Sequence, residues 1–421
     1  MTLIEFFDKT PLSNILGSLA LRPRRVVFIG TDRRKLSDAL PAIQKILRAR
    51  GLKTSLSLRV MDSYDLSGIL DILKDIIEYG SRVFGEDEYV FDFTGGEEAA
   101  LVAVGMVFRL TDQRAHIFQI SAETRQGMLY RIPLNGTGDI RLIPIDGTSD
   151  ENKVELTNAE GILLHNGRIR EEMVSGNTAD GFPFTDSVYK DINRLWKLCI
   201  PDCGFWNQQT GRLGGSVRET EEDPSVYSYH EKGMDENFMS RLESFGMLSF
   251  QRLGGRQYCT FKNPYIKDCL TKSGTLLEYK TYMTAFHYKA DNVKIPYTDA
   301  GAGVVIEWNG SDTRNEIDVM LMQGVLPYFI SCKNGDIKTD ELYKLHTVAG
   351  RFGNKYARRI LVSTTYFDPE DRSYDGDLAV RYMRERANDM HITILDRVHR
   401  MSDREFFDAL AGCAAETTVQ N

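Results

Sequence analysis

The first third of the chain alternates short apolar runs with longer segments in which apolar residues recur three and four positions apart. The longer segments have the period of amphipathic helices, and the short runs have the length of buried strands. This alternation predicts a parallel sheet covered by helices on both faces. The predicted strands are Val26–Ile29, Thr54–Val60, Tyr89–Phe93 and Ala115–Ile120, followed by the β-rich stretch Met128–Ile145. The predicted helices are Leu36–Arg50, Leu66–Phe84 and Glu97–Thr111.

The last third of the chain has a different pattern, in which strand-like runs follow one another directly. Three such runs separated by turn residues predict an antiparallel meander. They are Gly303–Trp308, Arg314–Met322 and Pro327–Lys333. Helical periodicity precedes them at Gly274–Tyr288 and resumes at Thr339–Gly350, and a further strand is predicted at Ile360–Thr364. The pattern therefore predicts a second α/β unit.

The middle of the chain has weaker periodicity. Asn207–Pro224 is rich in Gly, Arg and Glu and is predicted to be an exposed loop. The helix Glu236–Met247 and the basic hairpin Leu248–Phe261, turning at Gly254-Gly255, resemble half of a winged helix, which could contact nucleic acid or serve as a packing module. We therefore divide the chain into residues 1–150, a connector over residues 151–265, and residues 266–421.

Length and composition agree with several folded domains. The chain has 421 residues, of which 42% are hydrophobic and 27% charged, as in globular proteins with their own cores. No apolar run is long enough to span a membrane, so a cytoplasmic location is expected. The net charge is -8, so any polynucleotide must be held by a local group of basic residues.

Six cysteines are spread over the chain, and reduced thiols are expected in the absence of a signal peptide. A zinc site is disfavoured because the pairs Cys199/Cys203 and Cys259/Cys269 lack the two-residue gap of a zinc knuckle. The histidines show no metal-binding spacing either.

Two loops follow predicted strands of the first sheet, at the edge where open α/β sheets bind ligands. They are Gly30-Thr31-Asp32-Arg33-Arg34 and Thr94-Gly95-Gly96-Glu97-Glu98. Paired glycines allow a close approach of the backbone, and the next helix presents free N–H groups to a phosphate or ribose. Each loop could instead be a tight turn or a helix cap. Neither loop is a dinucleotide or Walker fingerprint, which disfavours an NAD enzyme or an ATPase.

Acidic and basic residues on the predicted meander suggest phosphodiester hydrolysis. Asp318 and Lys333 lie on neighbouring strands, and Glu278 lies on the preceding helix. Glu278 and Asp318 are predicted to bind Mg²⁺ or Mn²⁺, and Lys333 to orient the attacking water or stabilise the transition state. Glu316 could join Asp318, since the two residues share one face of a strand.

Competing interpretations of these charged residues remain open. Asp318 and Lys333 could form an ordinary surface ion pair. A basic group before the last strand could contact a polynucleotide backbone or be a solvated helix end; it comprises Arg351, Lys355, Arg358 and Arg359.

Four stretches together resemble the CRISPR ancillary nucleases that join a CRISPR-associated Rossmann-fold (CARF) sensor to a restriction-endonuclease-like PD-(D/E)xK domain. They are Glu5 to Leu12, Ile29 to Asp32, Asp92 to Glu98, and Asn315 to Asp318 with Ile330 to Gly335. The resemblance implies an α/β fold with a Rossmann-like CARF domain and a restriction-endonuclease-like domain. This sequence departs from the usual Glu-x-Lys motif, because Ser331 stands where an acidic ligand is normal. The departure weakens metal binding or shifts the ligand role to Glu278, Glu316 or Glu341.

The resemblance also implies function. The family forms homodimers whose two sensors bind a cyclic oligoadenylate, usually cyclic tetra-adenylate, during type III CRISPR antiviral defence, and it cleaves DNA or RNA with little sequence preference. Carried over to this chain, the activator-binding residues are Thr10, Gly30, Thr31, Asp32, Thr94, Gly95, Gly96 and Glu97. The catalytic residues are Glu278, Asp318, Ser331 and Lys333, of which Glu278 and Asp318 bind metal.

Two other functions remain open from the sequence. The chain could be an ungated restriction or repair endonuclease, or a nucleotide-responsive regulator that binds DNA without cutting it. If the chain is gated, our hypothesis is that Ile145–Gly181 transmits the signal between its halves.

Overall fold

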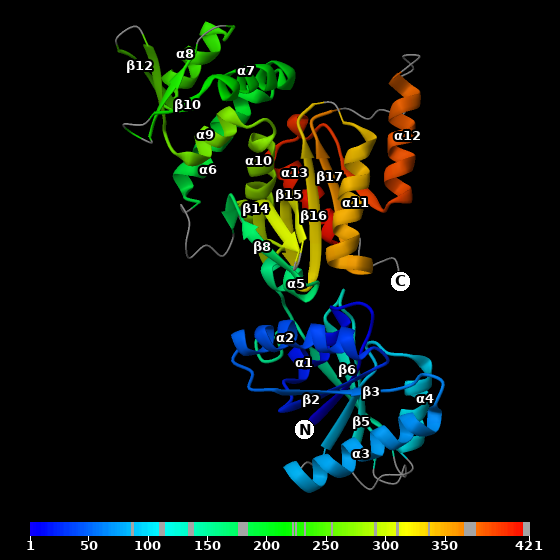
Figure 1. The fold of residues 1–421 in the computed structure, drawn as a ribbon. Helices are drawn as coiled ribbons and strands as arrows, with labels where there is room; N and C mark the ends of the chain where they lie inside the picture. Colours follow the sequence, from blue (N-terminus) through cyan, green and yellow to red (C-terminus); the bar gives the residue numbers. More distant parts are fainter. Residues whose placement is uncertain are drawn as a thin grey trace.

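The structure is a computed structural model that describes residues 1–85, 88–108, 114–133, 139–175, 184–220, 223, 225–230, 233–253, 256–289, 293–308, 311–335, 337–365 and 376–415. These residues form three sheets. Figure 1 shows the N-terminal sheet at the bottom, the C-terminal sheet, which also has seven strands, above it, and a small antiparallel sheet at the top.

The N-terminal sheet has the predicted parallel core. Its order is β3-β2-β1-β4-β5-β6-β7, with parallel pairing from β3 to β5 and antiparallel pairing after it. The strands are β1 Thr2–Phe6, β2 Arg25–Gly30, β3 Ser55–Val60, β4 Glu88–Asp92, β5 Arg114–Ile120, β6 Gln126–Arg131 and β7 Arg141–Asp146. The helices are α1 Ser13–Leu21, α2 Arg33–Ala49, α3 Leu66–Phe84 and α4 Glu98–Val107. Residues 109–111 of the predicted third helix lie outside the described part of the chain.

The central strand β1 was not among the predicted elements. It pairs with β2 on one side and β4 on the other, and all five of its residues are buried. Because a central parallel strand is covered on both faces, it lacks the polar–apolar alternation that marks a half-exposed strand. Helices α1 and α2 cover one face of the sheet, and α3 and α4 cover the other.

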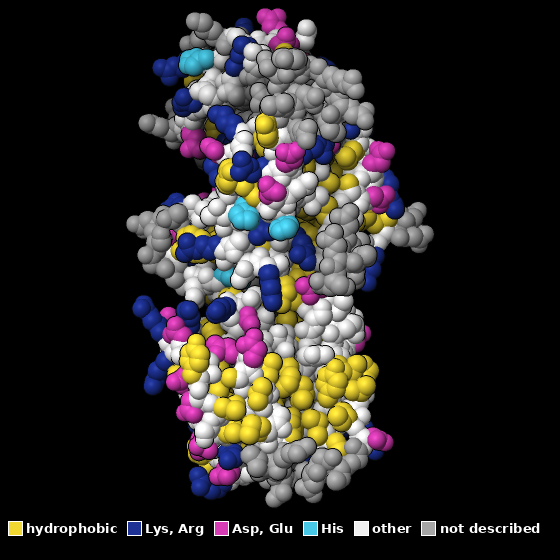
Figure 2. Space-filling view, turned by 90° about the vertical axis from the view of Figure 1, so that its right-hand side faces the viewer, with side chains coloured by type: hydrophobic (Ala, Val, Ile, Leu, Met, Phe, Trp, Pro, Cys, Tyr) yellow, Lys and Arg dark blue, Asp and Glu magenta, His cyan; other side chains and the backbone are white. Residues whose placement is uncertain are grey.

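Helix α4 is apolar on its exposed side as well as its buried side. Val102 is 56% exposed and Met106 is 43% exposed, although Ala103 and Val104 between them are buried. Figure 2 shows hydrophobic side chains gathered over the lower, N-terminal part of the face on which α4 lies. A helix that is hydrophobic all round is normally buried, so this face is suited to a partner.

The middle of the chain forms helices around a four-stranded antiparallel sheet of order β10-β11-β13-β12. The helices are α6 Asp186–Cys199, α7 Cys203–Ser216, α8 Glu236–Ser244 and α9 Pro264–Thr271. The strands are β10 Arg218–Glu219, β11 Val226–Tyr229, β12 Leu248–Leu253 and β13 Arg256–Phe261. The predicted helix and hairpin are confirmed by α8 and by the β12–β13 pairing, and the turn Gly254-Gly255 lies outside the described residues.

Helix α7 corrects the prediction of an exposed loop over Asn207–Pro224. Its N-terminus is capped by Asp202, which accepts a hydrogen bond from the backbone N–H of Phe205 at 2.7 Å. The glycine content lowers helix propensity, but tertiary packing overrides it. A Cβ at Gly214 would lie 2.0 Å from the backbone oxygen of Thr271, so glycine there allows α7 to pack against α9.

The C-terminal sheet has the order β18-β17-β16-β15-β14-β8, and β9 also pairs with β14. Its strands are β8 Gly167–Glu171, β9 Val174–Ser175, β14 Asp299–Trp308, β15 Ser311–Gln323, β16 Leu326–Lys333, β17 Arg358–Ser363 and β18 Ile392–Leu395. The predicted antiparallel meander is confirmed by β14, β15 and β16. Strands β8 and β9 come from the region assigned to the connector, yet they pair with β14 in this sheet.

Helices pack on both faces of the C-terminal sheet. Helix α10 Thr275–Phe286 packs against β14, β15, β16 and α13 Asp403–Ala415, and α11 Thr339–Gly353 packs against β16, β17 and α12 Gly376–Asp389. Helix α5 Asn158–Leu164 contacts both this sheet and α2 of the N-terminal part. Among the helices that the structure describes, none is long and apolar enough to cross a membrane.

Candidate functional site

Asp318 lies at a local break in the C-terminal sheet. The β14–β15 register passes from Ala302↔Val319 to Val304↔Ile317 without a Gly303↔Asp318 pair, and the β15–β16 ladder ends at Val319↔Ile330. Gly303 has φ +59°, a left-handed conformation that favours glycine. A Cβ there would also lie 2.3 Å from the side chain of Met173. One ladder pair is therefore missing at the residue predicted to bind metal, while the two strands keep the same register on either side, and we call this position the opening.

The Asp318 carboxylate takes the place of the missing ladder partner. Its Oδ2 accepts hydrogen bonds from the backbone N–H of Cys332 at 2.6 Å and the hydroxyl of Ser331 at 3.1 Å. The Lys333 ammonium lies 3.4 Å from the same oxygen. The structure thus brings together Asp318, Ser331 and Lys333, with Ser331 holding the carboxylate in position.

Lys333 lies between two carboxylates. Its Nζ is 3.2 Å from Oε2 of Glu341 on α11, and Glu341 also pairs with Lys344 at 2.8 Å. Burial lowers the pKa of Lys333, but Asp318 and Glu341 outweigh it, and the net effect is a raised pKa. Lys333 is therefore a fixed positive charge at the opening.

Glu278 on α10 lies close to the same group. Burial raises its pKa to about 8, with further contributions from the negative charges of Asp318 and then Glu316. The negative charges of Asp318 and Glu316 therefore act on a carboxyl group that is largely removed from water, and a nearby positive charge would favour its ionised form. Glu278 thus joins the predicted residues electrostatically, and Glu316 joins it as the sequence suggested.

The side-chain arrangement can be compared with what a divalent cation needs. Hard cations take oxygen ligands, which Glu278 and Asp318 would supply. In the part of the chain that the structure describes, no three His, Cys, Asp or Glu side chains are close enough to form a metal site by themselves. Water and substrate oxygens commonly complete the coordination of Mg²⁺, so two carboxylates fit this chemistry.

An amide network that the sequence did not reveal fixes the chain just after Lys333. Asn334 donates to Oδ1 of Asn207 on α7 at 2.8 Å and accepts from the hydroxyl of Thr364 at 2.8 Å. Asn207 also donates to the backbone oxygen of Asn334. The helix mistaken for a loop therefore holds the end of the strand that carries Lys333.

The predicted activator-binding residues gather at the carboxyl edge of the N-terminal sheet. Thr10 lies in the loop after β1, where its N–H donates to Oδ1 of Asp8 at 2.7 Å. Asn14 accepts from the N–H of Asp8 and donates to its carbonyl, at 2.7 and 2.9 Å. This loop is therefore held from within by Asn14, which the sequence analysis did not identify.

The glycine pair after β4 lies against the loop after β1. A Cβ at Gly95 would lie 2.7 Å from Cβ of Asp8, and a Cβ at Gly96, which has φ +113°, would lie 2.5 Å from Cβ of Phe6. Close packing of the two loops thus accounts for both glycines. Thr94 is also engaged, because its hydroxyl oxygen accepts from the N–H of Ile120 at 3.2 Å.

The loop after β2 completes the same edge. Gly30 is buried beside Phe7, whereas Thr31 is exposed. Asp32 caps α2 by accepting from the N–H groups of Arg34 and Lys35 at 2.9 and 3.1 Å, in agreement with the helix-cap interpretation. Glu97 is the N-cap residue of α4 but makes no side-chain cap hydrogen bond.

A buried pair of carboxylates lies beneath these loops and was missed from the sequence. Glu5 and Asp92 are register partners on β1 and β4, and both are fully buried. Burial and then Asp92 raise the pKa of Glu5, and burial raises that of Asp92 to about 6. A Cβ at Gly17 of α1 would lie 1.8 Å from Oδ2 of Asp92, so α1 covers the pair closely.

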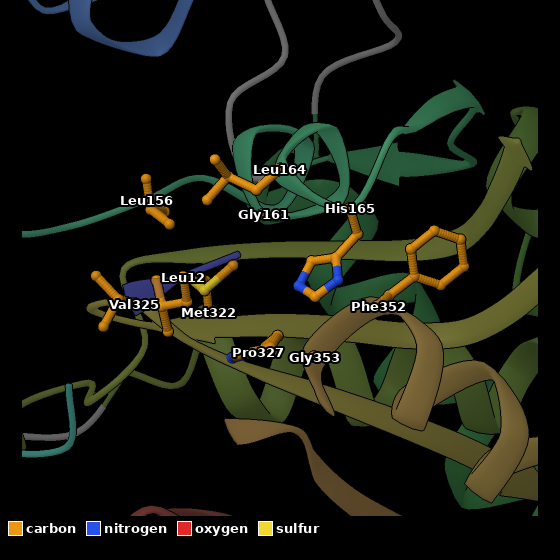
Figure 3. A pocket seen from close by; sticks show the side chains of 10 residues that line it. All are labelled: Leu12, Leu156, Gly161, Leu164, His165, Met322, Val325, Pro327, Phe352 and Gly353. Carbon is orange, nitrogen blue, oxygen red and sulfur yellow. The ribbon is translucent and has the colours of Figure 1, made fainter. Parts of the chain in front are cut away.

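An apolar junction joins the two halves of the molecule. Figure 3 shows Leu12, which follows the Thr10 loop, beside Met322 and Val325 at the β15–β16 turn. His165, the C-cap residue of α5, also lines the junction, and burial lowers its pKa to about 4, so it is neutral. The free volume is about 10 Å³, near that of a single water, so the junction is packed and holds no ligand.

Comparison with known proteins gives structural matches alone. No protein-family model and no curated protein matches the chain. The structure of protein VC1899 from Vibrio cholerae is similar over 99% of this chain and 98% of that one, with 17% identity and a TM-score of 0.69. Can2 from Sulfobacillus thermosulfidooxidans, in complex with cyclic tetra-adenylate, is similar over 98% and 97%, with 13% identity and a TM-score of 0.63. The chain therefore has the two-part α/β fold of VC1899 and Can2, which confirms the predicted fold class.

Proposed function

We propose that the chain is a metal-dependent nuclease switched on by a cyclic oligoadenylate in type III CRISPR antiviral defence. The observation that carries the nuclease assignment is the opening in the sheet where Asp318, Lys333 and Glu278 lie near one another. The activator is inferred from the shared fold with Can2, whose structure contains cyclic tetra-adenylate. DNA and RNA are both candidate substrates.

The residues of the opening have distinct roles in this mechanism. Glu278 and Asp318 would hold Mg²⁺ or Mn²⁺, which when bound polarises the scissile phosphate and promotes ionisation of a water. Lys333 stabilises the negative charge that develops on the phosphate. Ser331 and the N–H of Cys332 orient Asp318, so that its other oxygen is left for the cation. Ser331 thus serves as a positioning residue in place of an acidic ligand.

The three loops at the carboxyl edge of the N-terminal sheet would bind the activator. Thr10, Gly30, Thr31 and Asp32 lie on two of them, and Thr94 to Glu97 form the third. The exposed hydroxyl of Thr31 and the N-terminal N–H groups of α4 can meet ribose and phosphate oxygens. Such a site needs no deep pocket in one subunit if two subunits share the ligand.

The exposed apolar face of α4 supports a homodimer. Val102 and Met106 are large, exposed and adjacent on one helix. A second copy of the chain would cover them and place two sets of activator loops around one ring, whose symmetry matches that of a dimer. Gel filtration with light scattering measures this state, and a monomer at micromolar concentration contradicts it.

Two routes can carry the signal between the halves. The hypothesis from the sequence places it in Ile145–Gly181, of which residues 176–181 lie outside the described part of the chain. Within this segment Glu160 of α5 pairs with Arg50, the C-cap residue of α2, at 2.5 Å. A more direct route passes through Leu12, two residues after Thr10, to Val325 in the turn between the strands that carry Asp318 and Lys333. We propose that the activator acts through this junction.

The decisive experiment incubates the full-length protein with Mn²⁺, labelled RNA or single-stranded DNA, and cyclic tetra-adenylate or none. We expect cleavage that requires both the metal and the activator. Equal cleavage without activator supports the ungated endonuclease instead. No cleavage under any condition, with activator binding retained, supports a regulator without catalysis.

A further inference from the structure

Three arginines at the open edge of the C-terminal sheet surround one carboxylate. Arg168 Nη2 is 2.6 Å from Oε2 of Glu307, Arg170 Nη1 is 2.5 Å from Oε1, and Arg314 Nε is 3.6 Å from Oε1. Two of the arginines lie on β8, the last strand of the sheet, and the third lies on β15. We call these three residues the arginine cluster.

The cluster has more positive charge and more donors than Glu307 can use. The Glu307 side chain is 9% exposed, whereas those of Arg168, Arg170 and Arg314 are 66%, 42% and 56% exposed. Three guanidinium groups carry about fifteen N–H donors, and a carboxylate has about four acceptor positions. Glu171 approaches Arg170 at 3.8 Å, but it is itself 67% exposed and contributes little. Most of the N–H donors therefore face solvent, while the Glu307 carboxylate at the centre of the cluster is buried.

Chain geometry places the cluster near the opening at Asp318. Arg314 and Asp318 are four residues apart on β15, and a strand advances roughly 3.3 Å per residue, so their Cα atoms are at most about 13 Å apart. Along a duplex strand, phosphates recur about every 3.4 Å of helix axis. At this spacing, about four nucleotides separate a phosphate held at Asp318 from one held at the arginine cluster.

The basic group expected from the sequence is less well placed for this role. Arg358 is the register partner of Tyr328, whereas Ser363 is the partner of Lys333, so Arg358 lies five positions away along the strand from the Lys333 end. The Nε atoms of Arg358 and Arg359 are also buried. A polynucleotide at the opening needs another local source of positive charge, because the whole chain is acidic.

We propose that Arg168, Arg170 and Arg314 bind the phosphodiester backbone of the substrate strand beside the cleavage site. Guanidinium groups match phosphate oxygens in a bidentate geometry, and Glu307 holds two of them in place in advance of binding. The inference rests on the proposed nuclease function and adds a binding surface outside the catalytic residues. It predicts affinity for nucleic acid without base preference, since backbone contacts carry no sequence information.

The test uses the full-length protein with cyclic tetra-adenylate and a labelled single-stranded oligonucleotide in Ca²⁺. The variant Arg314→Ala leaves Glu307 with two partners, and Arg168→Ala/Arg314→Ala leaves it with one. Each lost arginine is expected to weaken binding several-fold and to reduce the slope of log affinity against log salt by about 0.7. The control is Arg404→Ala on α13, which removes an arginine paired with Asp408.

A second measurement separates this surface from the catalytic site. Hydrolysis of bis(p-nitrophenyl) phosphate, which has no neighbouring nucleotides, is expected to be unchanged in Arg314→Ala. Unchanged oligonucleotide affinity and salt slope in the variants overturn the proposal, as does a loss of dimer, which would make the surface a protein contact. If the wild type binds strands through these arginines but cleaves nothing, the nuclease function fails while the backbone site stands.

Discussion

Two pairs of carboxylates, one in each half of the molecule, resemble each other chemically and differ in access. In the N-terminal half Glu5 and Asp92 are fully buried and their pKa values are raised. In the C-terminal half the pKa of Glu278 is also raised, but Asp318 is 18% exposed and lies beside the Lys333 ammonium. A raised pKa therefore shows only that a carboxyl group is removed from water. A catalytic carboxyl group must also be accessible to substrate and lie beside a positive charge.

The backbone explains the difference between the two pairs. Glu5 and Asp92 form the last pair of the parallel β1–β4 ladder, and α1 covers them closely at Gly17. Asp318 lies where both neighbouring ladders are interrupted, so its carboxylate accepts hydrogen bonds from β16 and stays accessible. We infer that the first pair organises the sensor fold and that the second carries out catalysis.

The largest expected effect is the loss of cleavage when Asp318, the accessible carboxylate, or its counter-charge Lys333 is neutralised. Asp318→Asn and Lys333→Ala are each expected to lower the cleavage rate at saturating activator by at least roughly 100- to 1000-fold, the cost of removing one charge-stabilising group. The affinity for cyclic tetra-adenylate should not change. Wild-type cleavage in either variant would show that the opening is not the catalytic site.

A smaller effect is expected from the residue that positions Asp318. Ser331→Ala removes a hydrogen bond to the carboxylate, and loss of such a supporting contact typically costs about 10- to 100-fold in metal affinity or activity. The measurement is the Mn²⁺ dependence of cleavage. Ser402→Ala, at the start of α13, removes a hydroxyl far along the chain and is the matched control. Equal losses in both variants would indicate a general effect on folding.

The coupling between the two regions is tested at their junction. Leu12→Ala is expected to reduce the stimulation by activator roughly 2- to 30-fold, because contacts between coupled sites typically contribute 0.5–2 kcal/mol. A double variant with Val325→Ala should lose little more than either single variant, since both remove one contact. Leu16→Ala, on the helix α1 that Leu12 precedes and outside the junction, controls for destabilisation. If the activator stimulates Leu12→Ala as strongly as wild type, the signal passes through Ile145–Gly181 and not through the junction.

The smallest expected effect is a change in the thermal stability of the protein when one glutamate of each pair is replaced. The folded pKa of each glutamate is above its unfolded value, so the folded state keeps a proton that the unfolded chain has released, and stability falls as pH rises. For Glu278 this loss extends from pH about 4.5 to about 8. Glu278→Gln and Glu5→Gln should therefore both melt at a higher temperature than wild type at pH 8 without metal.

The comparison becomes sharper when cleavage is measured in the same two variants. Glu278→Gln should lose cleavage, because an amide is a poor ligand for a divalent cation, whereas Glu5→Gln should retain it. Melting is followed by circular dichroism at pH 5 and pH 8. A Glu278→Gln variant that melts below wild type at pH 8 would contradict the raised pKa.

The sequence pattern alone predicted the helices and strands that are buried on one side, and the strands that carry charged residues at apolar positions. Helix α3 was predicted with its observed bounds, because a half-buried helix repeats its apolar positions regularly. The meander was also predicted, and the structure brings Asp318 and Lys333 of that meander together. Asp318 and Lys333 drew attention because charged residues on apolar strands are uncommon.

The helices and strands that the sequence pattern did not predict are stabilised by tertiary packing and not by their local sequence. Strand β1 contains Glu5 in an apolar run, and α7 contains several glycines, so local propensity favours neither. Strand β8 is far along the chain from β14, its partner, and nothing in its sequence specifies that pairing. The role of Asn207 follows from the position of α7, and so it could not be predicted either.

Gly303 has a broader consequence for this molecule. A substitution there would meet Met173 and an unfavourable backbone angle together. We expect such a substitution to displace Met173 or the strand backbone opposite Asp318 and so to lower the proposed cleavage. A variant at this position would show whether the proposed hydrolysis depends on the shape of the backbone as well as on acidic and basic side chains, because every side chain assigned to catalysis would stay in place.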